Sequence, residues 1–156
     1  MISPELLRRY PFFGFLDDTQ LKAVAMIAED MRLKQGELLF EADTPASALY
    51  LIVDGRVDFL YVVADRAEPN LRKEYYLGEH GPGEIIGISA LIEPYVYSTA
   101  ARVTSPGCDV VRIEGAGLRA LCEVDSKLAY GLMRQTAKLA MERLHDTRTL
   151  LAAARA

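Results

Sequence analysis

Residues 31–113 constrain the fold most, because they consist of short apolar runs separated by glycines. The runs are rich in Val, Ile, Leu and Tyr, and the glycines between them are Gly36, Gly55, Gly78, Gly81, Gly83, Gly87 and Gly107. This texture is typical of short strands joined by turns. No long helical pattern intervenes, so the stretch predicts about six to eight strands in an antiparallel sandwich or barrel rather than a parallel sheet.

Two local features within this stretch predict particular turns. Gly55 lies between two β-rich runs, where a tight turn requires a positive φ that glycine adopts without strain. Residues 57–63 then alternate in character, and residues 67–70 supply a turn before the next apolar run, 71–77. A β-hairpin over residues 57–77 is the expected result.

Helical patterns flank the β-rich stretch on both sides. Asp17 and Gln20 form a capping-box pattern before apolar residues at helical spacing, which predicts a short helix in the N-terminal segment, 1–30. After residue 113 the helical period returns, with Asp125 as the expected N-cap of a helix over Ser126–Leu151. That helix would be about 39 Å long.

The long helix carries two apolar stripes. One stripe consists of Leu128, Leu132 and Leu139, and the other of Tyr130, Met133, Ala137, Ala140, Leu144 and Leu151. One stripe can pack on the β body, but a small domain leaves the far end of so long a helix uncovered. We therefore predict a homodimer whose seam is the second stripe. The alternative is that both stripes wrap a single core.

Composition excludes several function classes. The chain has 156 residues, a formal net charge of −4, 51% hydrophobic and 26% charged residues. These values suit one soluble domain, and the acidic balance gives no general attraction to nucleic acid. The basic N-terminus lacks the apolar core of a signal peptide, and no run is long enough to span a bilayer. Cys108 and Cys122 form no CxxC pair, so we expect a cytoplasmic protein with inert thiols.

Catalysis and metal binding find no support in the sequence. There is no Ser/His/Asp spacing, no cluster of metal-ligating residues and no phosphate-binding Gly-Lys motif. The two histidines, His80 and His145, stand alone, and His80 is interpreted as a structural or solvated residue of a glycine-rich loop. The protein is expected to be non-catalytic and to hold no metal.

The order of elements resembles the cyclic-nucleotide-binding domain of the catabolite-activator and protein-kinase-regulatory families. The segments that carry the resemblance are Leu6–Phe13 with Leu16, Gln35–Asp43, Leu49–Val57 and Gly83–Leu91. The last is similar to the start of the family's phosphate-binding cassette, Gly-Asp-x-Phe-Gly-Glu-x-Ala-Leu. The resemblance implies a mainly β fold, a β-roll or jelly-roll-like barrel over residues 31–113, with helices over residues 1–30 and 114–156 in one domain. It further implies a short cassette helix at Ser89–Ile92 and a long C-terminal helix that acts as dimer seam and lid.

The cassette departs from the family pattern at both of its phosphate and ribose anchors. Ile88 stands where ordinary members have a glutamate, and Tyr97 or Ser98 stands where they have an arginine. An arginine forms paired charge-assisted hydrogen bonds that a phenol or hydroxyl cannot reproduce. Arg102 on a strand and Arg143 on the long helix are candidate substitutes, although each is read first as a surface residue. Backbone N–H groups in the first turn at Ser89–Leu91 remain available to an anion.

These observations predict a regulatory or sensor module with an altered ligand pocket. The expected pocket residues are Gly87, Ile88, Ser89, Ala90, Leu91, Tyr97, Ser98, Thr99 and Arg143. No cofactor is assigned, a small-molecule ligand is an open alternative, and cyclic AMP or cyclic GMP is expected to bind weakly. Two other interpretations stay open: a cyclic-nucleotide-binding protein with relocated anchors, and a ligand-free dimerisation or docking domain. Transcription factors of the family carry a helix-turn-helix after the long helix, and we expect no DNA-binding domain within this chain.

Overall fold

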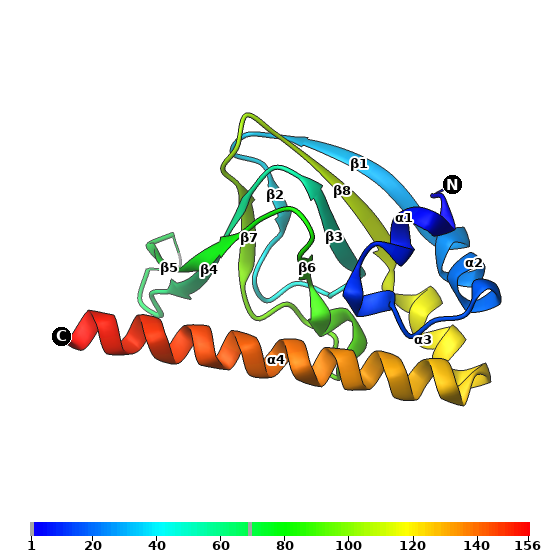
Figure 1. The fold of residues 1–156 in the computed structure, drawn as a ribbon. Helices are drawn as coiled ribbons and strands as arrows, with labels where there is room; N and C mark the ends of the chain where they lie inside the picture. Colours follow the sequence, from blue (N-terminus) through cyan, green and yellow to red (C-terminus); the bar gives the residue numbers. More distant parts are fainter. Residues whose placement is uncertain (1, 69) are drawn as a thin grey trace.

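The computed structural model describes residues 2–68 and 70–156. Within these residues, two four-stranded antiparallel sheets form a β-roll, ordered β1-β8-β3-β6 and β2-β7-β4-β5 (Figure 1). The strands are β1 (Ala28–Lys34), β2 (Leu38–Phe40), β3 (Ala48–Asp54), β4 (Val57–Ala64), β5 (Arg72–His80), β6 (Ile85–Ile86), β7 (Ala100–Val103) and β8 (Gly107–Glu114). The expected antiparallel β-roll is confirmed. The first strand begins at Ala28 rather than at the predicted residue 31, because Ala28 already pairs with Ile113.

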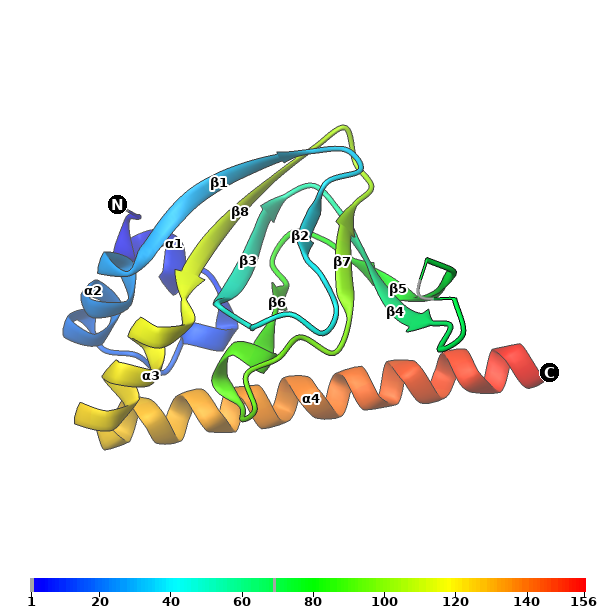
Figure 2. The same cartoon turned by 180° about the vertical axis from the view of Figure 1, so that it is seen from behind.

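Helices gather at one end of the roll and along its base. They are α1 (Pro4–Arg8), η1 (Pro11–Phe13), α2 (Asp18–Met26), η2 (Ile88–Leu91), α3 (Gly115–Val124) and α4 (Ser126–Arg155). Figure 2 shows α1, α2 and α3 at the same end, while α4 runs under the roll toward the β4–β5 hairpin. At 30 residues, α4 is about 45 Å long. Among the described residues, no helix is both long and apolar enough to cross a membrane.

Side-chain caps fix where the helices begin. Asp17 and Gln20 form the predicted capping box at the start of α2, with the Gln20 N–H donating to Asp17 Oδ1 at 2.8 Å. Asp125 caps α4 by accepting from the Leu128 N–H at 3.0 Å. The Gln20 amide also donates to Asp125 Oδ2 at 3.0 Å. One polar cluster therefore sets the start of both helices and holds them together.

Apolar side chains form two core clusters. The first core cluster lies among the N-terminal helices, α3 and the first half of α4, and includes Leu7, Phe13, Leu21, Leu118, Leu128 and Leu132. The second core cluster fills the roll and includes Phe40, Tyr50, Ile52, Phe59, Tyr97 and Val110. Leu128 and Leu132 are buried as predicted, and Leu139 packs partly against the first core cluster. Met133 belongs to the predicted dimer seam, yet it also packs against that cluster, because it directly follows the buried Leu132 in α4.

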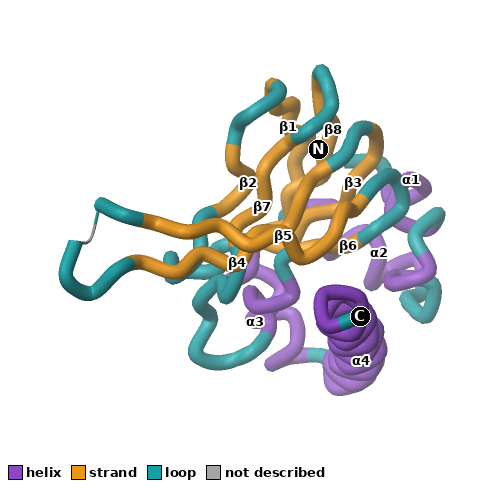
Figure 3. The backbone as a smooth tube through the Cα atoms, turned by 90° about the vertical axis from the view of Figure 1, so that its left-hand side faces the viewer, coloured by secondary structure: helices purple, strands orange, loops and turns teal. Residues whose placement is uncertain are grey.

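The β4–β5 hairpin extends away from the body of the roll (Figure 3). Its strands pair from Val57 opposite His80 to Ala64 opposite Arg72, so the predicted hairpin is confirmed. Tyr61 and Tyr75 are direct cross-strand partners, and both rings are about half exposed. The base of the hairpin, in contrast, contributes buried residues to the roll.

Gly55 makes the turn that its position in the sequence predicts. Its φ is +100°, and a Cβ there would lie 2.6 Å from the Gly107 carbonyl oxygen. Gly36 has a similar φ of +89°, yet a Cβ there would meet no atom within 4 Å. Both glycines have a positive φ that other residues adopt only with strain. Of the two, only Gly55 also lies so close to other atoms that a side chain would clash.

This pair separates backbone strain from steric clash. We expect Gly36→Ala to lower the free energy of unfolding by about 1 kcal/mol, since alanine only tolerates that φ at a cost. Gly55→Ala should lower it by roughly a further 1–3 kcal/mol, because backbone atoms of β8 must move. Urea denaturation of both variants measures the difference. Equal losses would contradict the close approach of β8 to Gly55.

Candidate functional site

The cassette turn is held by contacts with β3. Gly87 has φ +86° and caps η2 in the left-handed conformation. A Cβ on Gly87 would lie 3.0 Å from the Ala48 carbonyl oxygen and 3.5 Å from the Tyr97 ring. Glycine is favoured here because of the left-handed φ and because the Ala48 carbonyl approaches too closely for a side chain to fit without a shift.

Tyr97 occupies the inner end of the cassette. Its side chain is buried and stacks on Phe40 with ring centroids 4.0 Å apart. The hydroxyl donates to the Ala48 carbonyl at 2.6 Å and accepts from the Ala48 N–H at 3.2 Å. Burial raises the pKa of Tyr97 to about 12, so the phenol stays neutral at physiological pH. Of the two candidates for the position of the family's arginine, Tyr97 places an uncharged ring inside the roll, and Ser98 is exposed.

A cavity of about 700 Å³ remains between the roll and α4. Three groups of residues line it: the roll and hairpin residues Phe40, Phe59 and Tyr76 to His80, the cassette residues Gly87 to Ser89 and Tyr97 to Thr99, and the α4 residues Ala140, Arg143 to Thr147, Thr149 and Leu150. This volume is within the usual range for small-molecule sites. Residues from segments far apart in the sequence meet here.

Seven of the nine predicted pocket residues line this cavity. They are Gly87, Ile88, Ser89, Tyr97, Ser98, Thr99 and Arg143. Ala90 and Leu91 do not, because η2 turns their side chains into the second and first core clusters respectively. The helix also begins one residue earlier than expected, at Ile88 rather than Ser89. Ile88 is half-buried and packs against the first core cluster as well as facing the cavity.

The two candidate arginines have different surroundings. Arg102 forms a double hydrogen bond with Glu74 on β5, at 2.8 and 2.9 Å, and is not among the residues that line the cavity. Arg143 is half-buried, lines the cavity and donates to the Ile85 carbonyl. Its guanidinium carbon lies 4.9 Å from the centre of the Phe59 ring. Arg143 is therefore the cation that a cavity ligand can reach.

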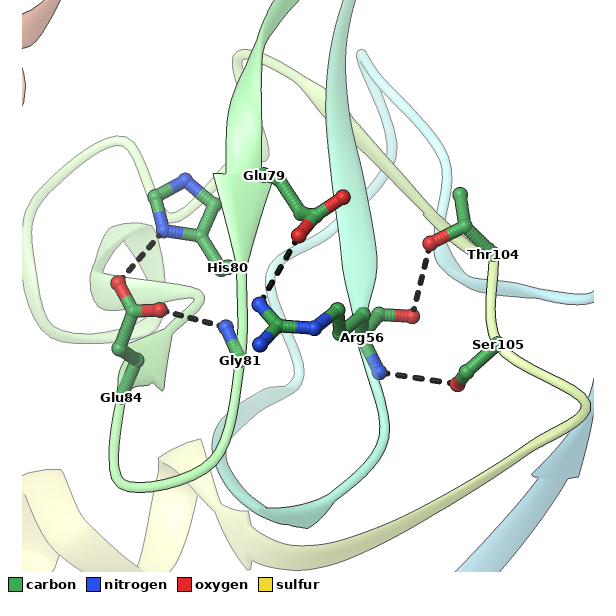
Figure 4. A network of polar contacts seen from close by, with 7 residues as sticks. All are labelled: Arg56, Glu79, His80, Gly81, Glu84, Thr104 and Ser105. Atoms are coloured by element: carbon green, nitrogen blue, oxygen red, sulfur yellow. Dashed lines mark hydrogen bonds and ion pairs between the residues drawn. The ribbon is translucent and has the colours of Figure 1, made fainter.

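His80 belongs to a polar network at the end of β5 (Figure 4). Nδ1 lies 2.9 Å from Glu84 Oε1, and the other oxygen of Glu84 accepts from the Gly81 N–H. Glu79 pairs separately with Arg56 at 2.9 Å. Of the two interpretations of His80, the structural one agrees with its burial against the Phe59 ring, with centroids 4.2 Å apart. The solvated one is wrong, and His80 ends a strand rather than lying in a loop.

Sequence reasoning missed the aromatic wall and the distal half of the α4 wall. Phe59 could have been found from the alternation of residues 57–63, which places it on the inward face of β4. Thr147 and Leu150 follow Arg143 at helical spacing and so share its face. His80 gave no such signal, since its contact with the Phe59 ring forms only when β4 and β5 pair.

Metal and thiol chemistry find no support in the described part of the chain. In residues 2–68 and 70–156, no group of three or more His, Cys, Asp or Glu side chains could hold a metal ion. Cys108 is buried and Cys122 is half-buried, and both are free thiols. Burial raises the pKa of each thiol, which disfavours the reactive thiolate.

Titration of His80 should make stability depend on pH. Burial and the charge of Arg143 lower its pKa below the ordinary 6.5, while Glu84 and Asp146 oppose the shift; Asp58 on β4 interacts with His80 only electrostatically. Folding stability is then complete above about pH 6.5 and falls at lower pH, because the unfolded chain binds a proton that folded His80 resists.

We expect the wild-type free energy of unfolding to decrease between pH 7.5 and 5.5, by at most about 1.4 kcal/mol per pH unit from this one proton. His80→Gln should flatten the decrease, whereas His145→Gln, at an exposed position on α4, should leave it unchanged. Urea denaturation across this pH range measures the effect. Parallel curves for wild type and His80→Gln would contradict the assignment.

Comparison with known proteins identifies the roll. A model of the family "cyclic nucleotide-binding domain" matches residues 30–125. Among curated protein sequences, none matches the chain significantly. A crystal structure of a candidate cyclic nucleotide-binding protein from Geobacter metallireducens is 36% identical, with a TM-score of 0.79 over 93% of this chain and 100% of the other.

More distant structures share the fold. The sensor domain of the transcriptional regulator DNR from Pseudomonas aeruginosa is 18% identical, with a TM-score of 0.70 over 90% of each chain. The regulatory domain of Toxoplasma gondii PKA, solved with cAMP, is 19% identical, with a TM-score of 0.62 over 75% of this chain and 42% of the other. With the family match over residues 30–125 and the 36% identity to the Geobacter protein, the chain belongs to the cyclic nucleotide-binding domain family.

Proposed function

We propose that this chain is a non-catalytic regulatory or sensor module whose cassette does not anchor a cyclic phosphate, and that it acts as a homodimer through α4. The observation that carries the first part is Tyr97, whose hydroxyl is bonded to both backbone groups of Ala48. Moving this ring aside would leave those buried groups unpaired, which costs about 1–3 kcal/mol for each group.

The cassette segments Gly87–Leu91 and Tyr97–Thr99 themselves contain no Lys or Arg. Ile88 supplies an apolar side chain where the resemblance expects a glutamate, and Ser98 and Thr99 supply only hydroxyls. Losing both anchors should weaken a micromolar nucleotide by roughly two to four decades. This supports a pocket with different ligand chemistry.

The cavity favours an altered pocket over a vestigial one. Tyr97 fills the inner end of the roll, yet about 700 Å³ stays open between the cassette and α4. A domain used only for docking would need no such space. We therefore favour a module that still binds a small molecule over the ligand-free alternative.

The dimer is supported by the exposure of the second stripe of α4. Tyr130, Leu144 and Leu151 are 69%, 49% and 56% exposed, and Met141 beside them is 72% exposed. Ala137 and Ala140 are exposed between them and would let a second helix approach closely. Large apolar side chains on one helix face are typical of an interface.

Titration calorimetry tests the ligand prediction. We expect cyclic AMP and cyclic GMP to bind with dissociation constants well above micromolar, and Arg102→Gln, the control, to change nothing. Ile88→Glu combined with Ser98→Arg should create measurable binding, because Ser98 is exposed and lines the cavity, so a new guanidinium there can reach a phosphate.

Micromolar binding by the wild type would overturn the altered-pocket proposal. Such binding would favour the second candidate function, a nucleotide sensor with a relocated anchor, and Arg143 is the residue that could supply the anchor. Loss of that binding in Arg143→Gln, with no change in Arg102→Gln, would establish this alternative.

Sedimentation velocity tests the dimer. We expect the wild type to sediment as a dimer at micromolar concentration, and Leu144→Glu or Leu151→Glu to give monomers, because a charge buried in an apolar seam is strongly unfavourable. Lys138→Glu alters an exposed α4 residue outside the stripe and should remain dimeric. A monomeric wild type contradicts the proposal.

A further inference from the structure

Arg143 is a half-buried cation with no carboxylate partner in the described part of the chain. Its guanidinium donates to the Ile85 carbonyl and lies over the Phe59 ring. Glu84, Glu142 and Asp146 act on it electrostatically, but none of them forms an ion pair with it within 4.0 Å. At least part of its hydrogen-bonding capacity therefore faces the cavity that it lines.

Among the described residues, five other arginines are paired with carboxylates, whereas Arg119, which is also half-buried, donates to the Ala90 carbonyl and lies over the Tyr95 ring. Carboxylate partners are found for Arg8, Arg32, Arg56, Arg102 and Arg112. Desolvating a charge is costly unless an opposite charge or hydrogen bonds compensate it. Burial lowers the pKa of Arg143, which reflects this cost. An anion entering the cavity would supply the missing partner.

The acidic residues in and near the cavity wall do not supply the missing partner of Arg143. Glu79 lies in the lining but is paired with Arg56 at 2.9 Å. Glu84 is not among the lining residues, and it is bonded to His80 and to the Gly81 N–H. Asp146 is exposed on α4, where solvent and salt screen its charge. The repulsion that a bound acid would meet is therefore weaker than its attraction to Arg143.

The rest of the wall is mostly apolar. Phe40, Phe59, Leu77 and Leu150 face the space, and Ile88 adds an aliphatic side chain beside the cassette. Ser98 and Thr99 add hydroxyls from the cassette. A ligand that fills this cavity needs an apolar body to contact the wall. It also needs one acidic group to pair with the Arg143 guanidinium.

We propose that the cavity binds an apolar organic acid, with its acidic group on the Arg143 guanidinium and its hydrophobic body between the aromatic wall of the roll and α4. This inference rests on the proposed function, because it names the ligand class of the altered pocket. A planar carboxylate or sulfonate fits the fork of N–H donors that arginine presents.

Two fluorescent probes with the same aromatic body test the proposal. 8-Anilinonaphthalene-1-sulfonate carries one acidic group, and N-phenyl-1-naphthylamine carries none. In a site without a cation the neutral probe should bind at least as well, since it is the more apolar of the two. We expect the sulfonate to bind the wild type about tenfold tighter or more, with one probe per chain. Equal or weaker binding of the sulfonate would overturn the proposal.

Arg143→Gln should reduce the ratio of the two affinities to about one, by weakening the sulfonate and leaving the neutral probe unchanged. Arg134→Gln is the matched control on an exposed part of α4 and should keep the wild-type ratio. If Arg143→Gln loses both probes, its cavity has collapsed, and Arg143→Lys takes its place. Lysine keeps the positive charge without the planar fork of N–H donors, so the ratio of sulfonate to neutral-probe affinity should fall partly. The proposal is overturned if this ratio stays at the wild-type value in every Arg143 variant that still binds the neutral probe.

Ser98→Trp establishes where the probes bind. An indole at this exposed lining position should obstruct the cavity and abolish both signals. Probes bound instead at Tyr130 and Met141 on α4, or at Tyr61 and Tyr75 on the hairpin, which do not line the cavity, would be unaffected. Unaffected binding of the sulfonate overturns the proposal. The nucleotide titrations remain a separate measurement, so tight cyclic AMP binding would refute the proposed function whatever the probe ratio is.

Discussion

The arrangement of the site depends on one side chain, Tyr97, placed in the centre of the roll. Its hydroxyl satisfies both backbone groups of Ala48, and its ring stacks on Phe40. Because Ala48 begins β3 and Phe40 ends β2, this one contact joins the two sheets at the cassette. The Ala48 carbonyl oxygen to which the hydroxyl donates would also lie 3.0 Å from a Cβ on Gly87. The cassette turn is therefore held by a neutral phenol. A site for a cyclic phosphate would instead need a charged side chain to pair with the ligand.

The cavity exists because α4 is held at separated points rather than packed along its whole length. Its first turn is tied to α2 through Gln20 and Asp125. Further along, Gly131 is buried beneath Phe15, where even a methyl group would collide with the ring. Arg143 then bonds to the Ile85 carbonyl. Between these contacts and the roll the space stays open, and its walls come from two bodies that fold through different core clusters.

Much of the fold was predictable because its signals are local. The capping box at Asp17, the glycine turn at Gly55 and the burial of Leu128 each follow from a few neighbouring residues, and all three are confirmed. The site was predictable only in part. The resemblance located the cassette, but it could not tell which face of a single turn Ala90 and Leu91 would occupy. The contact of His80 with the Phe59 ring forms only when β4 and β5 pair. The unpaired state of Arg143 depends on where α4 lies, which no local pattern encodes.

The same attachment of α4 has a mechanical consequence. Gly131 is locked against Phe15, whereas the turns beyond Arg143 are mostly exposed. Arg143 lies about 18 Å along the axis from Gly131, and Arg155 lies about as far again beyond it. When a stiff helix pivots near Gly131, the displacement of each residue grows with its distance from the pivot. A displacement of about 1 Å at the cavity wall would therefore become about 2 Å at the last turn of α4. A small change in how the cavity is filled would be doubled at the end of the helix.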